Sequence, residues 1–335
     1  MEYLEFNNEK RVYHVFGKQH KLDTPVLMLF FNRSEQFGKV FSAVREAAPS
    51  VLYLYQDGPR KNRNDEKGIA ECRKILEQID WDCEVHTWFR EKNCGCDPSE
   101  YLCQKWAFSE VDKCIVLEDD DLPNQSFFLF CQNMLNKYEN DERINIVCGM
   151  NHLGEYHSDK SDYFFSTICS IWGWASWSRV VNEWVSNYEF LTDGNVVSNL
   201  KKLDRTTQIK EVLAASRKHK RTGVAYYETV LASEMFLNHR LNIIPSKNLI
   251  SNIGIAASST HSADSIKKLP HGIRRVFNMR TFELTFPLKE TKYLIEDIEY
   301  QKKVKRIMGW GYPLVKVYRK CERGFLMIWY KIFKA

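Results

Sequence analysis

Four consecutive carboxylates, Glu118–Asp121, are the residues of this sequence whose types and spacing most directly suggest chemistry. They follow the apolar run Cys114–Leu117, which indicates a buried strand, and the segment ends at Pro123, which closes a turn. Adjacent carboxylates repel one another, and a hard divalent cation with oxygen ligands relieves that repulsion and can also bind phosphates. The run therefore predicts a metal and diphosphate site. The alternative is a solvated acidic loop after a buried strand.

The elements that must position these carboxylates alternate between strands and helices. A third helical pattern begins at Asp97-Pro98-Ser99-Glu100, with Asp97 as the expected N-cap. This alternation is typical of βαβ units and predicts an α/β protein with a mostly parallel sheet flanked by helices. The candidate strands are Pro25–Asn32, Val51–Gln56, Cys83–Phe89, Cys114–Leu117 and Ile144–Met150, and the other helical patterns are Ser34–Ala47 and Asp65–Ile79.

Polar residues follow three of the predicted strands, at Asn32-Arg33-Ser34, Gln56-Asp57-Gly58 and Glu118–Asp121. In open α/β sheets, ligands bind beyond the carboxyl ends of the strands. We therefore expect the three segments to converge on one site. From about Phe164 the sequence becomes aromatic and rich in turns, notably over Ser170–Trp177, and we expect this part to form the other half of the same domain.

Charge is distributed unevenly along the 335 residues. Residues 301–335 hold ten Lys and Arg residues against Glu322 alone, a net charge of +9, so the total of +5 leaves −4 for residues 1–300. The body therefore lacks the basic surface expected of a nucleic-acid-binding protein. Ten cysteines are spread through apolar runs, which favours buried reduced thiols over a disulfide framework. Without a signal peptide pattern or a long apolar run, we expect a cytoplasmic protein.

The motifs occur in an order that resembles GT-A-fold glycosyltransferases, a Rossmann-like fold that binds nucleotide-diphospho-sugars. The similarity is to the family of α-1,3-mannoside β-1,2-N-acetylglucosaminyltransferases and its bacterial haemolysin-like and sugar-transferase relatives. It spans residues 24–265, with a nucleotide-binding half at 24–150 and an acceptor half at 151–265, and leaves residues 266–335 as an extension. The matching segments are Pro25–Ser34, Gln56-Asp57-Gly58, Leu117–Asp120, Ser126-Phe127-Phe128, Trp172-Gly173-Trp174, Asn252-Ile253-Gly254 and Thr260-His261.

The resemblance implies a role for individual residues. Arg33 and Asp57 match positions that contact the nucleotide. Glu118-Asp119-Asp120 matches the EDD form of the DxD motif, in which the last Asp binds Mn²⁺ or Mg²⁺ and the middle Asp lies near the ribose. Glu228, in Tyr226-Tyr227-Glu228-Thr229, matches the catalytic base. The family has Asp at that position, so the side chain here is one methylene longer.

The residues themselves leave other interpretations open. Arg33 at a helix start favours phosphate or a pyrimidine edge, and the alternative is a surface arginine paired with a carboxylate. Asp57 stands before Gly58-Pro59, where it can simply form a turn. His261 is consistent with a metal ligand, a hydrogen-bond donor to the diphosphate or a loop histidine, and residues 254–262 are a candidate lid.

Aromatic residues supply the candidate acceptor contacts. Trp172 and Trp174 flank a glycine that allows a ligand to approach the backbone, and we expect one of them to stack on a sugar ring. The alternative for both, and for nearby Trp177, is a place in the core.

The C-terminal tail interleaves Lys and Arg with aromatic and aliphatic residues from about residue 300. This pattern is typical of a basic amphipathic helix that lies on anionic lipid. The alternative is a helix docked on the body with its charges in water. We expect the former, and hence peripheral association with the inner face of a membrane.

These features together predict a metal-dependent, inverting glycosyltransferase. It would move a sugar, with N-acetylglucosamine as one candidate, from a UDP-sugar to a glycan or lipid-linked acceptor in surface polysaccharide synthesis. One rival is a sugar-nucleotide nucleotidyltransferase, but Asn32-Arg33-Ser34-Glu35 is not the Gly-rich loop that such an enzyme carries. The other rival is a non-catalytic relative that only binds nucleotide-sugar, for which a broken carboxylate set is expected.

Overall fold

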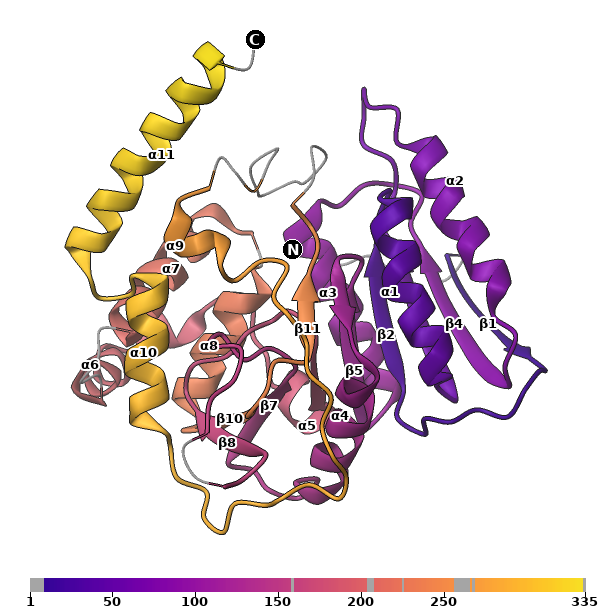
Figure 1. Ribbon diagram of the computed structural model, residues 1–335, viewed down its shortest axis with the longest axis horizontal. Coiled ribbons are helices and arrows are strands. Elements are labelled where there is room, and N and C mark those ends of the chain that lie inside the picture. Colours follow the sequence, from indigo (N-terminus) through magenta and orange to yellow (C-terminus); the bar gives the residue numbers. More distant parts are fainter. Residues whose placement is uncertain are drawn as a thin grey trace.

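A nine-stranded mixed sheet runs through the part of the chain that this computed structural model describes, which is residues 9–157, 160–203, 208–224, 226–255, 266 and 269–333, without the side chains of 330–333 (Figure 1). In order across the sheet the strands are β1 (Lys10–Val15), β4 (Cys83–Phe89), β3 (Val51–Gln56), β2 (Val26–Phe30), β5 (Lys113–Glu118), β9 (Trp174–Trp177), β7 (Ile144–Cys148), β10 (Leu241–Pro245) and β8 (Tyr163–Ser166).

The sheet is only partly parallel. β4, β3, β2 and β5 are parallel to one another, and β7 is parallel to β10, whereas β1, β8 and β9 pair antiparallel with their neighbours. The predicted α/β class is therefore confirmed, but the prediction of a mostly parallel sheet is corrected to a mixed one. The main departure is β9, which lies between β5 and β7 and runs opposite to both.

Helices cover both faces of the sheet. α1 (Ser34–Ala47), α2 (Glu66–Ile75) and α4 (Gln125–Lys137) pack on one face, and α3 (Cys96–Glu110), α8 (Tyr227–Leu237) and α10 (Ile298–Met308) pack on the other. The remaining helices are α5 (Ser178–Val181), α6 (Gly194–Leu203), α7 (Gln208–Thr222), α9 (His271–Arg274) and α11 (Pro313–Phe333).

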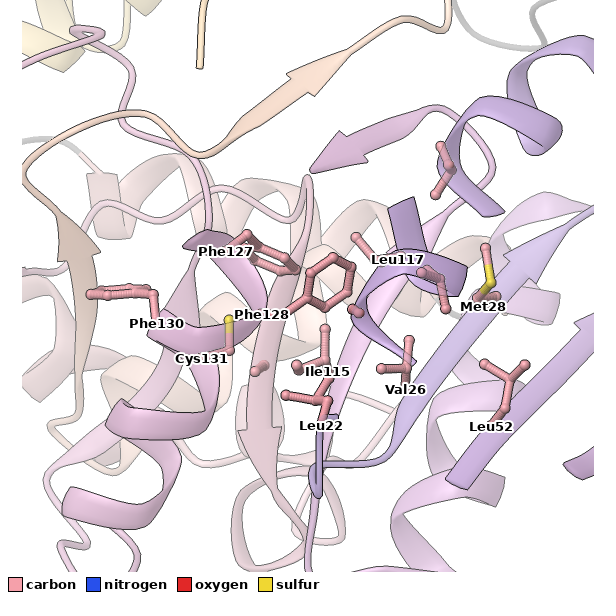
Figure 2. Close-up of a cluster of buried hydrophobic side chains, with 14 of the residues drawn as sticks. Leu22, Val26, Met28, Leu52, Ile115, Leu117, Phe127, Phe128, Phe130 and Cys131 are labelled. Carbon is pink, nitrogen blue, oxygen red and sulfur yellow. The ribbon is translucent and has the colours of Figure 1, made fainter. Parts of the chain in front are cut away.

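Strands β2 and β5 are buried on both faces. Along β2, Val26 and Met28 join the core under α1 and α4, while Leu27 and Leu29 join the core under α3. Figure 2 shows the first of these cores, in which Phe128 of α4 lies beside Ile115 and Leu117 of β5. Burial on both faces is typical of central parallel strands and fixes their ends firmly in space.

The predicted helix bounds hold well for α1, whose apolar residues recur at intervals of three and four on the buried side. α2 ends at Ile75 and is followed by a 3₁₀ turn, so the α-helix in the structure is shorter than the predicted Asp65–Ile79. α3 begins at Cys96, with Gly95 at the N-cap position and a φ of +89°. The expectation that Asp97 caps this helix was wrong, because the helix begins two residues earlier than that cap implies.

A second, two-stranded sheet forms directly after the carboxylate run. β6 (Asp121–Pro123) pairs antiparallel with β11 (Ile250–Asn252), with Asp121 opposite Asn252. The predicted turn is thus a short strand, and it brings residues more than a hundred positions apart into contact with the carboxylates.

The C-terminal part divides into a packed and a projecting helix. Tyr300 and Val304 of α10 are fully buried in the core on the α3 side, so α10 belongs to the body. α11 extends away from the body (Figure 1). No helix in the described residues is long and apolar enough to cross a membrane.

Candidate active site

The order in which the chain adds parallel strands to the sheet reverses between β2 and β5. From β2 the chain proceeds outward through β3 to β4 and then returns to place β5 on the other side of β2. Such a switch point leaves a crevice beyond the carboxyl ends of the two strands, where α/β proteins bind ligands. Arg33 follows β2 and Glu118 ends β5, so both lie at this crevice.

Arg33 and two of the carboxylates form one ion-pair group. Its guanidinium contacts the carboxylate of Asp119 with Nε and Nη2, and its Nη1 lies 2.9 Å from Oδ2 of Asp120. Burial opposes the charge on Arg33, but the two carboxylates outweigh burial and raise its pKa. The predicted convergence of these two segments is confirmed. Arg33 is also paired with a carboxylate, as the alternative interpretation of this residue expected. The pair is largely buried, however, and does not lie on the surface.

Asp57 organises the loop that faces Arg33 across the crevice. Its carboxylate accepts hydrogen bonds from the backbone N–H groups of Gly58, Cys94 and Gly95 and from the side-chain amide of Asn93, at 2.8–3.1 Å. Burial raises the pKa of Asp57, and the backbone donors oppose that rise. Asp57 therefore stabilises the turn at Gly58, as the turn-forming interpretation of this residue expected, and it also lines the crevice. A nucleotide contact for Asp57 stays a prediction.

Replacing Asp57 with alanine should destabilise the protein by about 2–4 kcal/mol. The change leaves three backbone N–H groups and one amide without their acceptor at a buried position. Urea unfolding of Asp57→Ala measures this loss, with Asp57→Asn as the control that keeps one acceptor oxygen. Equal stability of Asp57→Ala and the wild type would show that these bonds contribute little.

A cavity of about 190 Å³ occupies the crevice, and we call it the switch-point cavity. Arg33 and Asp119 lie on one side, Asp57 and Asn93 on another, and the rings of Phe31 and Tyr55 supply apolar wall. Arg60 also borders it, with its guanidinium 5.1 Å from the centre of the Phe31 ring. The cavity thus combines aromatic surface with four carboxylates and with two guanidinium groups, each of which is paired with a carboxylate.

A second group of carboxylates lies on the inner side of this cavity. Glu118 accepts a hydrogen bond of 3.1 Å from the hydroxyl of Tyr227, at the start of α8. Glu100 of α3 accepts one of 3.1 Å from the thiol of Cys96. Burial, followed by the charge of Glu228, raises the pKa of Glu100 to about 8. Burial and the charges of neighbouring carboxylates, Glu228 among them, raise the pKa of Glu118 as well.

Glu100 is a site residue that the sequence did not reveal. In the sequence it stands near a helix start, where an acidic residue is ordinary. Only the placement of α3 against the ends of β2 and β5 turns it toward Glu118 and Glu228. Glu228 itself, the predicted base, lies close enough to both for its charge to affect their protonation.

Glu100 should make stability depend on pH. The unfolded side chain titrates near pH 4.5 and the folded one near 8, so the folded state binds the proton more tightly. Stability is therefore fully present below about pH 4.5 and falls as pH rises toward 8, by on the order of a few kcal/mol. Glu100→Gln should remove most of this fall, as urea unfolding at about pH 5 and pH 8.5 will show. Glu77→Gln makes the same change at an exposed position and is the matched control. A fall of wild-type size in Glu100→Gln would contradict the assignment.

Asp120 and Asp121 are held by the end of β11 and by the residue before β9. The amide of Asn252 lies 3.3 Å from an oxygen of each carboxylate, and the N–H of Gly173 donates to Asp121 over 2.9 Å. A side chain at Gly254 would overlap the carboxylate of Asp120. Asp121 is fully buried and serves to join β6, β9 and β11, whereas Asp120 faces Arg33.

The second candidate cavity, of about 470 Å³, is lined by Glu228, and we call it the Glu228 cavity. Trp172 lies in its wall, with its ring centre 4.9 Å from that of Phe277. Trp174 does not reach it: its ring is fully buried and packs beside Phe108 and Tyr227. The expectation of a sugar contact is therefore corrected for Trp174, because the side chain belongs to the core, and stays a prediction for Trp172.

The prediction that Asp120 holds a divalent cation stays a prediction. In the described part of the chain no group of three or more His, Cys, Asp or Glu side chains is arranged to hold a metal ion. The oxygen ligand at Asp120 suits Mg²⁺ or Mn²⁺ that takes its remaining ligands from phosphate and water. In this structure, Arg33 supplies the positive charge beside Asp120. His261 and residues 256–262 of the predicted lid lie outside the described residues.

Comparisons with protein-family models and with curated protein sequences found no match.

Proposed function

We propose that this protein is a metal-dependent, inverting glycosyltransferase of the GT-A fold that uses a UDP-sugar as donor. One observation carries the proposal: two separate cavities are each lined by carboxylates, and the carboxylates of the two cavities lie near enough for their charges to interact. Glu100 and Glu118 line the switch-point cavity, Glu228 lines the Glu228 cavity, and their charges interact. A transferase needs this arrangement, because donor and acceptor must enter separately and meet at the reacting atoms.

The switch-point cavity suits a nucleoside diphosphate. Phe31 and Tyr55 offer aromatic surface for a base, and Arg33 offers a guanidinium for phosphate oxygens. Arg33 stands at the N-cap of α1, where unpaired backbone N–H groups and the helix dipole also favour an anion. A diphosphate would compete with Asp119 and Asp120 for Arg33, and a divalent cation at Asp120 would remove that conflict.

A divalent cation at Asp120 would offset the negative charges of the carboxylates and of the bound diphosphate. Mg²⁺ or Mn²⁺ at Asp120 would supply Lewis-acid stabilisation of the leaving diphosphate. The residues of the chain contribute the rest of the proposed donor site: Asn252 orients the Asp120 carboxylate, and Arg33 binds the anion.

Glu228 is the proposed base for the acceptor hydroxyl. It lies in the first turn of α8, next to Tyr227, whose hydroxyl donates to Glu118 at the end of β5. This contact ties the start of α8 to the carboxylate motif, so the base is held at a defined distance from the donor. Glu228 would accept the hydroxyl proton as the oxygen attacks the anomeric carbon.

A thermal-shift screen of nucleotides tests the proposal. A ligand that binds only the folded state raises the apparent melting temperature. We expect UDP and UDP-sugars to stabilise the protein more with Mn²⁺ than without it, and CMP-sugars to have little effect. The screen also selects the donor for rate measurements. Equal shifts with and without Mn²⁺ for every nucleotide would count against a metal-dependent donor site.

A further inference from the structure

Helix α11 exposes its apolar side. Exposed fractions reach 82% for Leu314 and are still 50% for Trp329. Residues spaced at intervals of three and four lie on the same side of a helix, so these side chains form one stripe. The stripe consists of Leu314, Val317, Tyr318, Phe325, Ile328 and Trp329.

A neighbouring side of α11 contacts the body, through polar groups and through half-buried Val315 beside Gly309. Arg319 donates to the carbonyls of Ile307 and Met308, the last turn of α10, with a distance of 2.8 Å to the Met308 oxygen. Lys316 pairs with Glu211 of α7, and Glu322 accepts a hydrogen bond from the N–H of His271. A helix docked for stability buries its apolar side. The stripe of α11 stays exposed although a neighbouring side of the helix contacts the body, which argues against the docked alternative.

We infer that the apolar stripe of α11 lies in the headgroup region of an anionic membrane. Charge distinguishes this occupant from others. Helix α11 itself carries five Lys and Arg residues against Glu322, a net charge of +4, and two of the five, Lys320 and Arg323, are exposed. Anionic lipid attracts such a segment, whereas a second copy of α11 would bring like charges together. With no spanning helix among the described residues, α11 would lie along the surface.

The location of α11 has a consequence for the acceptor, and this consequence rests on the proposed function. Met308 and Trp310, just before α11, line the Glu228 cavity, and Glu211 lines it too while pairing with Lys316 of α11. A membrane that holds α11 would therefore lie near this cavity. The acceptor hydroxyl would belong to a glycan carried on a membrane lipid.

Vesicle co-sedimentation of the full chain tests the inference. The probes are vesicles of phosphatidylcholine alone and with about one third phosphatidylglycerol. We expect binding to the anionic vesicles, and at least about tenfold weaker binding for the double variant Phe325→Ser, Ile328→Ser, because each change removes apolar area from the lipid. Rising salt should weaken wild-type binding. The matched control is Phe16→Ser, Ile295→Ser, which changes the same residue types at exposed positions outside α11 and should bind like the wild type.

Three results would overturn the inference: no binding of the wild type to anionic vesicles, equal binding of the α11 variant, or equal loss in the control. A dimer in sedimentation velocity that the α11 variant abolishes, without vesicle binding, would assign the stripe to a second copy instead. Mn²⁺-dependent UDP binding, measured on the same proteins, separates the two proposals. UDP binding without vesicle binding overturns only the membrane inference, and vesicle binding without UDP binding overturns only the donor site.

Discussion

Glu228→Gln should lower sugar transfer about a hundredfold or more while leaving donor affinity nearly unchanged. General-base catalysis typically contributes at least this factor, and an amide of the same shape cannot accept the hydroxyl proton. The substitution also removes a negative charge beside Glu100 and Glu118, so the site should tolerate it structurally. Initial rates of UDP release with the donor found by the screen, and calorimetric titration of UDP, measure the two quantities.

Glu234→Gln provides the control on the same helix. Glu234 lies near Glu183, Arg240 and Asn238 rather than beside the carboxylate motif. Its replacement should therefore leave the transfer rate close to that of the wild type. A wild-type rate for Glu228→Gln would remove Glu228 from the proposed mechanism, and a large loss in Glu234→Gln would move the base to that residue.

Asp120→Asn should abolish the increase in UDP affinity that Mn²⁺ provides. Asparagine keeps a polar group opposite Asn252 but loses the negative charge that attracts a divalent cation. We expect the Mn²⁺-dependent part of the affinity to fall by about a hundredfold or more, since even residues that only support metal ligands cost tenfold to a hundredfold. Binding of UDP without metal should persist, because Arg33 then has one carboxylate fewer to pair with.

Calorimetric titration of UDP with and without Mn²⁺ measures both quantities. Asp112→Asn is the control, because it makes the same change at an exposed position just before β5. An unchanged Mn²⁺ dependence in Asp120→Asn would show that the cation, if it binds, is held elsewhere. A loss of all UDP binding would indicate that the substitution disturbs the site more broadly.

The parts of the fold that follow from local rules were predictable. Ser34–Ala47 shows its helical period plainly, and the apolar runs that form β2, β3, β4 and β5 are separated by segments long enough for crossovers. Once these strands are parallel, their carboxyl ends share one edge. Arg33 and Asp119 must then be neighbours, although 86 positions separate them.

Other features depend on tertiary placement and were beyond the sequence. Trp174 and Trp172 are two residues apart in an aromatic segment, and only the position of β9 inside the sheet decides which one is buried. β9 itself is four residues long and buried throughout, so it has no alternation to indicate its direction. Glu100 likewise resembles an ordinary helix-start residue until α3 brings it to Glu118 and Glu228. The outward orientation of the α11 stripe depends on which side Arg319 contacts.

A crystal structure of the full chain with UDP and Mn²⁺ would test the proposed donor site most directly. We expect the diphosphate beside Arg33 and the cation at Asp120, with the uracil ring in the switch-point cavity between Phe31 and Tyr55. The sugar-bearing end of the diphosphate should point toward Glu228. A nucleotide bound elsewhere, or a diphosphate that contacts neither Arg33 nor a cation at Asp120, would contradict the account.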